Sequence, residues 1–378
     1  MYPRTNVIDC KLSMKRVLLI AWLLAGVALS LVAQPQATWL ERQHDFGVIR
    51  EQDGKAHCQL RVMNTGTEPL LIVKVQVGCG CTGIDYPEDP IMPGDTATVS
   101  LSYNPSGRPG QFTKQAIIFT NTDIKRTIVE ISGNVIPTDA TLDKEYPIRA
   151  GDLRISQRVI PFGELVKGKG STLYLSAYNA STDTLLVSVT GAKPHIRPAV
   201  VPDTVPPARV TALTVHYASR YAPLWGLNED TLTMECRPLS PTSTAAKGAA
   251  DIQVMAQVME NFDNLTDKQR ADAPVIAIDC DERLDFGTMK AGEVVTRTFT
   301  ITNKGKERLA IRRLWAPQGE GITLSADRQE VKRGKKATIT VTVDTSCQQE
   351  NILNVPLTLM SNDPDNPRVT IRLVGIID

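Results

Sequence analysis

Asp45-Phe46-Gly47-Val48-Ile49 is the stretch that decides the fold, because the chain repeats it twice. It returns as Pro161-Phe162-Gly163-Glu164-Leu165 and again as Asp285-Phe286-Gly287-Thr288-Met289. The Phe-Gly pairs lie 116 residues apart (46 to 162) and then 124 residues apart (162 to 286). Three copies of one motif at a nearly constant interval indicate three tandem domains of one kind.

A second shared feature follows each Phe-Gly pair: an alternating segment that ends in Asn, at residues 60–64, 174–179 and 299–303. Phe46 to Asn64 is 18 residues, and the corresponding spacing in the other two copies is 17. Polar turns and segments rich in β-branched residues come next. Period-two alternation broken by short turns is typical of the strands of an all-β sandwich.

The sequence therefore predicts an all-β protein with three tandem immunoglobulin-like β-sandwich domains. We place them at residues 38–137, 152–260 and 275–378. An interval of about 100 residues is the usual size of such a sandwich. Residues 138–151 and 260–272 are predicted to be linkers, the second with a single helical turn, and no longer amphipathic helix is expected.

The N-terminus carries the pattern of a secretory signal peptide. Lys15 and Arg16 precede an apolar run of sixteen residues (17 to 32), and Ala33 then provides a small residue for cleavage. A membrane anchor is the alternative, but a span needs about 20 apolar residues. We expect residues 1–33 to be removed, with Met14 as the true start. The mature chain is then exported to the periplasm or cell surface, without a stable membrane span.

Charge and motifs bear on the class of function. Lys+Arg number 42 and Asp+Glu number 41, which gives a formal net charge of +1. A nucleic-acid-binding protein needs a clustered basic excess, so no nucleic-acid partner is expected. The chain has no Gly-x-Ser-x-Gly elbow, no His-Glu-x-x-His and no P-loop. We therefore expect no enzymatic activity.

The first predicted domain resembles a known family at several motifs. The most specific is Val77-Gly78-Cys79-Gly80-Cys81-Thr82, and others are Ile91-Met92-Pro93-Gly94-Asp95 and Ile131-Ser132-Gly133-Asn134-Val135. It resembles the bacterial domain-of-unknown-function family 1573, whose fold is similar to the Hydin-type and major-sperm-protein-type immunoglobulin-like domains. The third domain follows the general pattern, with Leu314-Trp315-Ala316 in place of the cysteines. The resemblance implies the fold and no established activity.

Cys58, Cys79 and Cys81 are the candidate site residues, and strand parity directs all three toward one end of the first domain. Three hypotheses stay open for them. They form a structural disulfide, Cys58 with Cys79 or Cys81, or serve as small buried hydrophobes. Alternatively, Cys79 and Cys81 clamp a soft metal such as Cu(I), assisted by residues from the set Met63, Met92, His44 and His57. Otherwise the Cys-Gly-Cys pair forms a bridge for thiol-redox exchange.

The function predicted from the sequence is a non-catalytic, exported cell-envelope protein. Its domains serve as structural or protein-interaction modules, with an envelope protein as partner and no resident cofactor. The alternative is a soft-metal-binding or thiol-redox protein that acts through Cys79 and Cys81. A bridge between Cys280 and Cys347 is a further candidate. Trp225 and Trp315 are candidates for a sugar-binding aromatic platform, and core packing explains them equally well.

Overall fold

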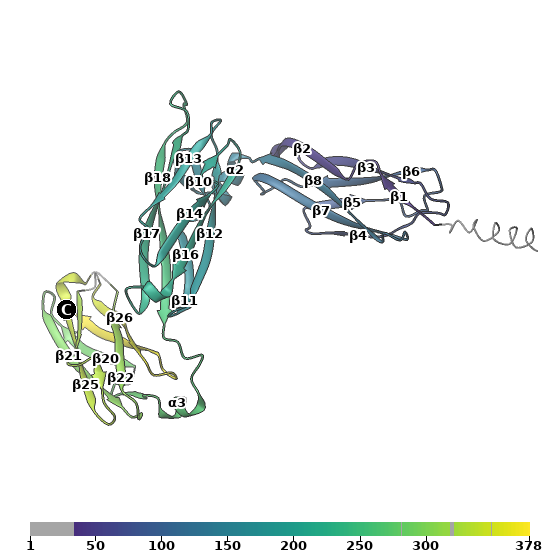
Figure 1. Cartoon of the computed structure of the whole chain (residues 1–378). Helices are drawn as coiled ribbons and strands as arrows, with labels where there is room; N and C mark the ends of the chain where they lie inside the picture. The colour runs from purple at the N-terminus through teal and green to yellow at the C-terminus, as the bar shows by residue number, and fades with distance from the viewer. Residues whose placement is uncertain (1–33, 281, 318–320, 349) are drawn as a thin grey trace, which may run out of the picture. The chain divides into compact units, whose positions relative to one another are not determined.

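The computed structural model describes residues 34–378 except 281, 318–320 and 349 (Figure 1). The predicted signal peptide lies outside the described residues. The chain divides between Thr141 and Leu142 into two compact units, which are described separately below. Within the described part of the chain, no helix has both the length and the apolar character that a membrane span requires.

The first unit is a sandwich of two sheets. One sheet has the order β1 (Ala37–Trp39), β3 (Ala56–Asn64), β6 (Thr96–Tyr103) and β5 (Thr82–Asp85). The other has the order β2 (Gln43–Arg50), β8 (Arg126–Ile136), β7 (Gly110–Thr120) and β4 (Ile72–Val77). A short 3-10 turn, η1 (Glu51–Asp53), follows β2. Alternate residues of these strands face inward and form one apolar core.

The second unit contains two further sandwiches, each around its own core. In the first of them, one sheet has the order β14 (Ile196–Val201), β16 (Val210–Ala218), β12 (Gly170–Asn179), β10 (Leu153–Ile155) and β9 (Ile148–Ala150). The facing sheet has the order β11 (Val159–Val166), β18 (Gly248–Met259), β17 (Gly226–Pro238), β13 (Leu185–Thr190) and β15 (Thr204–Val205). The turn η2 (Ser219–Tyr221) follows β16.

The last sandwich has the same plan. One sheet has the order β19 (Ile276–Ile278), β21 (Val294–Asn303), β25 (Lys336–Asp344) and β23 (Ile322–Ala326). The other has the order β20 (Arg283–Met289), β27 (Arg368–Ile377), β26 (Ile352–Ser361), β22 (Leu309–Trp315) and β24 (Glu330–Val331). The turn η3 (Thr345–Cys347) follows β25. The all-β fold of tandem sandwiches predicted from the sequence is confirmed.

The repeated Phe-Gly motif is a bulge in the strand that pairs with the last strand of each sandwich. Strands β2, β11 and β20 run parallel to β8, β18 and β27, and each ladder shifts register at the motif. The glycines Gly47, Gly163 and Gly287 have φ values of +63°, +64° and +70°, a region that side chains disfavour. The motif therefore recurs because a bulge of this kind needs glycine.

The repeated Asn closes the turn at the end of the second motif in each sandwich. In the first, the Asn64 amide nitrogen donates to the carbonyls of Glu68 (2.8 Å) and Ile91 (2.9 Å), and its oxygen accepts from the Gly66 N–H (3.0 Å). Asn179 and Asn303 make the equivalent three bonds, and all three side chains are fully buried. Because each buried amide satisfies its hydrogen bonds in this way, it stabilises both the turn that follows the Asn and the segment before the next long strand.

Two local features differ from the sequence predictions. The segment 138–151, expected to be a linker, contains the helix α2 (Asp139–Glu145) and the strand β9. The second linker holds α3 (Asp267–Asp272), as expected of a single short helix. The alternation of Val73, Val75 and Val77 predicts that Val73 faces inward. Val73 is instead exposed, because a register shift between Ile72 and Lys74 reverses the alternation there.

Candidate functional site

The cysteine pair of the first sandwich is joined. A disulfide links Cys79 to Cys81, whose Cα atoms lie 5.3 Å apart, in the turn between β4 and β5. Cys81 is buried and Cys79 is half-buried. The Thr82 hydroxyl lies 3.8 Å from each sulfur. The bridge closes a three-residue ring, so it shapes one turn and does not tie distant strands together.

Cys58 is a separate, buried thiol, so the bridge from Cys58 to Cys79 or Cys81 considered above is not formed. Cys58 does share its inward face with Leu60 and Val62, as strand parity predicted. However, it pairs across the sheet with Leu101, which in turn faces Ile84, three residues beyond Cys81. Burial raises the pKa of the Cys58 thiol and keeps it protonated.

The soft-metal hypothesis needs two thiolates that the structure places in a disulfide. Copper binding at Cys79 and Cys81 would therefore require prior reduction. Among the described residues, no group of three or more His, Cys, Asp or Glu side chains is placed to hold a metal ion. Of the proposed helpers, Met92 is exposed and His44 packs edge-on against Phe46, with ring centroids 4.6 Å apart.

The other cysteines and tryptophans of the sequence analysis lie apart from this site. Cys347 is exposed, and Cys280 is half-buried and is not bonded to it. Cys236 is buried, with its sulfur 2.9 Å from the Ala150 carbonyl oxygen. Trp225 is half-buried against the core of its own sandwich, under the Lys167 ammonium at 5.2 Å, which favours the packing explanation.

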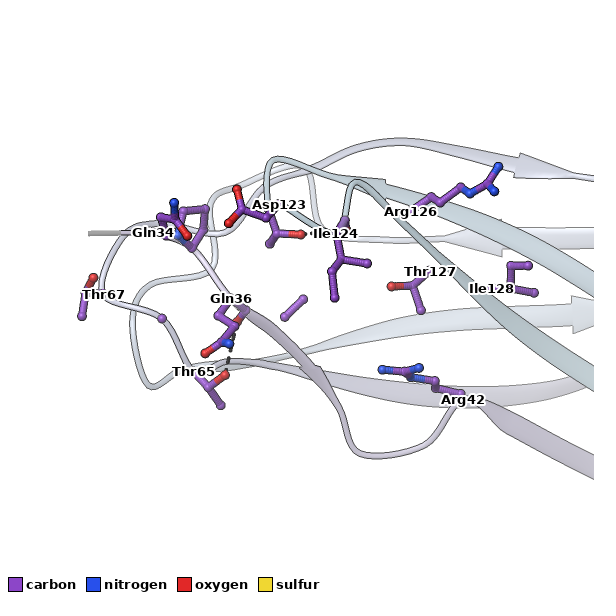
Figure 2. A pocket seen from close by; sticks show the side chains of 14 residues that line it. Gln34, Gln36, Arg42, Thr65, Thr67, Asp123, Ile124, Arg126, Thr127 and Ile128 are labelled. Atoms are coloured by element: carbon purple, nitrogen blue, oxygen red, sulfur yellow. Dashed lines mark hydrogen bonds between the residues drawn. The ribbon is translucent and has the colours of Figure 1, made fainter. Parts of the chain in front are cut away.

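A groove opens at one end of the first sandwich, between β1 and the start of β8. Its volume is about 780 Å³. Figure 2 shows the side chains around it, with Gln36 and Thr65 on one wall and Arg126, Thr127 and Ile128 on the other. The lining is completed by Gln34, Pro35, Ala37, Arg42, Gly66, Thr67, Thr122, Asp123 and Ile124.

The groove exists because the first strand of the sandwich changes sheets. β1 pairs with β3, and β2 then pairs with β8, but only from Glu130 onward. The N–H of Glu130 donates to the Arg42 carbonyl, just before β2. On the other side of β8, the carbonyl of Lys125 accepts a hydrogen bond from β7. By the alternation of a strand, the N–H and C=O of Arg126 and Ile128 point away from β7 into the uncovered interval.

The facing wall also carries an unpaired strand edge. Gln36 O accepts from Thr65, and the Leu40 N–H donates to Arg61 O, so the even-numbered residues of β1 bond to β3. The N–H and C=O of Ala37 and Trp39 therefore point to the other side, where β1 has no neighbouring strand among the described residues. Two rows of unpaired backbone groups thus border one groove, and unpaired rows are templates for strand addition.

The groove is lined mainly by neutral polar Gln and Thr side chains, together with two arginines and two exposed isoleucines. Ile124 and Ile128 are 77% and 50% exposed. Arg42 and Arg126 are exposed, and the described part of the chain shows no ion pair for either guanidinium. Asp123 supplies one carboxylate to the lining. Sequence reasoning missed this site; the apolar Ile124 in a polar hairpin turn was the available signal.

A family model described as "Protein of unknown function (DUF1573)" matches residues 37–135 and 278–377. The chain belongs to this family. The two matched segments are the first and last sandwiches, and the first match contains both the disulfide and the groove. No curated protein matches the sequence.

Several solved structures are similar to parts of the chain. A protein of unknown function from Porphyromonas gingivalis W83 is 20% identical, covering 60% of this chain and all of that one, with a TM-score of 0.46. The PapD-like domain 7 of human CEP192 is 17% identical over 30% of this chain and 92% of that one, with a TM-score of 0.24. WR4, an MSP family member of C. elegans, is 15% identical over 28% and 98%, with a TM-score of 0.22.

Proposed function

We propose that the protein is a non-catalytic, exported component of the bacterial cell envelope whose sandwich domains act as protein-interaction modules. The observation that carries the proposal is the groove of the first sandwich, bordered by unpaired backbone groups of β1 and β8. Exposed sheet edges bind partners through main-chain hydrogen bonds, with side-chain pockets adding specificity.

Other features agree with a binding role. His195 and Asp230 form a His–carboxylate pair of a kind that also occurs in catalytic sites, but both side chains are enclosed, at 4% and 5% exposure. A substrate has no access to groups enclosed to this degree. The description of the family names no activity.

Export rests on the sequence of residues 1–33, and one structural feature supports it. Disulfides persist in oxidising compartments such as the periplasm and are rare in the cytosol. The Cys79–Cys81 bridge fits that environment. Its short ring and its place in a turn favour a structural role in shaping the end of the sandwich.

The experiment is cross-linking and affinity capture of the full-length, tagged protein from fractionated cells. We expect the protein in an envelope or periplasmic fraction, with a reproducible partner that is also captured by the Cys79→Ser/Cys81→Ser double variant. Retention in the cytoplasm would contradict export. Loss of capture in the double variant, together with copper or zinc uptake by the reduced wild type in native mass spectrometry, would favour the metal-binding alternative.

A further inference from the structure

The second sandwich shows what fits into a groove of this kind. There β10 pairs with β12 as β1 pairs with β3, with Leu153 and Ala37 at equivalent positions opposite Asn179 and Asn64. In addition, β9 pairs antiparallel with the free edge of β10. The equivalent of the first groove is therefore filled by an extended segment of the chain itself.

A single residue permits that filling. The chain turns between β9 and β10 at Gly151, whose φ is +59°. The turn packs tightly onto the start of β18, because a Cβ on Gly248 would lie 2.1 Å from the Gly151 nitrogen. The residue equivalent to Gly151, two positions before Ala37, is Pro35. Proline fixes φ near −65°, so the chain cannot make the same turn in the first sandwich.

The last sandwich has the same restriction but a different groove. Pro274 takes the place of Pro35, and in the part of the chain that the structure describes no strand covers the free edge of β19. Its cavity is about 190 Å³, against about 780 Å³ in the first sandwich, and is lined mainly by apolar residues such as Ile276 and Ile371. Glu282 takes the position of Arg42, because the N–H of Arg372 donates to the Glu282 carbonyl as the N–H of Glu130 donates to that of Arg42. Only the first of these grooves is both large and basic.

We propose that the first groove binds an extended, acidic segment of a partner protein, added as a strand along the free edge of β1. The proposal deepens the interaction function above and rests on it. The Ala37 and Trp39 backbone would supply hydrogen bonds, as β10 does for β9. Alternate side chains of the added strand face the Arg42 and Arg126 guanidiniums, which outnumber the Asp123 carboxylate.

The test uses the mature chain, residues 34–378, and a fluorescent synthetic peptide of alternating valine and glutamate. A peptide with lysine in place of glutamate is the control probe. We expect the acidic peptide to bind and to slow amide hydrogen exchange in β1 and at Arg126 and Ile128. The Arg42→Glu/Arg126→Glu variant should bind the acidic peptide at least about tenfold more weakly, because the two charge reversals replace attraction by repulsion.

Two further variants sharpen the result. Arg158→Glu is the matched control: its carbonyl accepts from Gln253 as that of Arg42 does from Glu130, but its groove is already filled by β9. It should leave binding unchanged. A chimaera of the mature chain in which residues 148–152 replace residues 34–36 supplies the Gly151 turn and a strand of its own. It should lose peptide binding while remaining folded by circular dichroism.

Three outcomes would overturn the site. The first is that the lysine peptide binds as tightly as the acidic peptide. The second is that Arg158→Glu weakens binding as much as Arg42→Glu/Arg126→Glu does. The third is self-association without peptide that the Arg42→Glu/Arg126→Glu variant abolishes, which would assign the groove to a second copy of the chain. If the peptide does not bind but the full-length Arg42→Glu/Arg126→Glu variant still captures its envelope partner, the groove proposal fails and the proposed interaction function stands. If no peptide binds and no partner is captured, both proposals fail.

Discussion

His195 and Asp230 form a hydrogen-bonded pair inside the second sandwich, with 2.8 Å between Nε2 and Oδ2. Lys193 donates to the other carboxylate oxygen at 2.5 Å. Burial by itself would raise the pKa of Asp230, but the bonds from His195 and Lys193 outweigh it and hold that pKa below its ordinary value. The carboxylate is thus more stable in the folded chain than in the unfolded one.

This pair predicts acid sensitivity of one sandwich. A lowered folded pKa contributes stability above the unfolded value of about 3.9, and that stability is lost as pH falls through the folded value. Asp230→Asn should be less stable at neutral pH and lose less stability below pH 4. Hydrogen exchange of β16 and β17 at several pH values measures both effects. The peptides of the last sandwich serve as the internal reference, and a parallel pH response of wild type and variant would contradict the assignment.

The buried asparagines predict a large effect from a small change. Asn303→Asp places a carboxylate against the carbonyl oxygens of Glu307 and Val331, both of which now accept from the amide. We expect a loss of at least about 2 kcal/mol in the free energy of unfolding of the last sandwich. Thermal melts measure this loss. The control is Asn351→Asp, which makes the same change at an exposed position of the same sandwich. Similar melts for the two variants would count against the role of the buried amide.

Glu51 predicts a local effect in the first unit. Its carboxylate accepts from the Gly107 N–H at 2.8 Å, the Thr138 N–H at 2.9 Å and the Thr141 hydroxyl at 2.7 Å. Burial opposes ionisation, but these donors prevail and lower the pKa of Glu51. Glu51→Ala should speed amide exchange at Gly107 and Thr138.

The control for Glu51 is Glu41→Ala, which removes an exposed ion pair with Arg61 at 3.4 Å. Exposed pairs contribute about 0–1 kcal/mol, so this variant should leave exchange at Gly107 and Thr138 unaltered. Equal exchange in both variants would show that Glu51 does not hold the segment after β8.

Thiol accessibility gives a prediction for the cysteines of the folded, oxidised chain. Cys347 is exposed, whereas burial raises the pKa of both the Cys58 and the Cys236 thiols. Because the thiolate is the reactive form, Cys347 should account for the fast phase of alkylation at neutral pH. Cys347→Ser should remove that phase, and Cys58 should react only after unfolding. Rapid labelling of Cys58 in the native protein would show that its strand opens readily.

The sequence revealed the strands well because their marks are geometric requirements. A bulge at positive φ requires Gly47, and a doubly closed turn requires Asn64, so both recur visibly in each copy. Local events were harder to foresee. The register shift that exposes Val73 leaves no mark in the alternation. The helix α2 is only seven residues long and buries Leu142 alone, too little for a periodic pattern.

The site was hidden from the sequence for a different reason. The alternation that continues β4 directs Cys79 and Cys81 inward whether Cys81 bonds to Cys58 or to Cys79. Which disulfide forms depends on how β3 and β5 align against β6, and the sequence pattern does not show that alignment. The groove depends on a strand that is missing, and sequence patterns report the strands that are present. Besides Ile124, a further clue is Pro35 in place of Gly151, which can be recognised only when the two copies are aligned by their pairing registers.

The buried asparagines also bear on how the protein ages. Deamidation begins when the backbone nitrogen of the following residue attacks the asparagine side-chain carbonyl. In all three copies that nitrogen is bonded across to the strand before it: Thr65 to Gln36, Ala180 to Asp152 and Lys304 to Val275. The three buried amides are therefore held out of reach of the reaction, so we expect them to outlast exposed asparagines of the same chain.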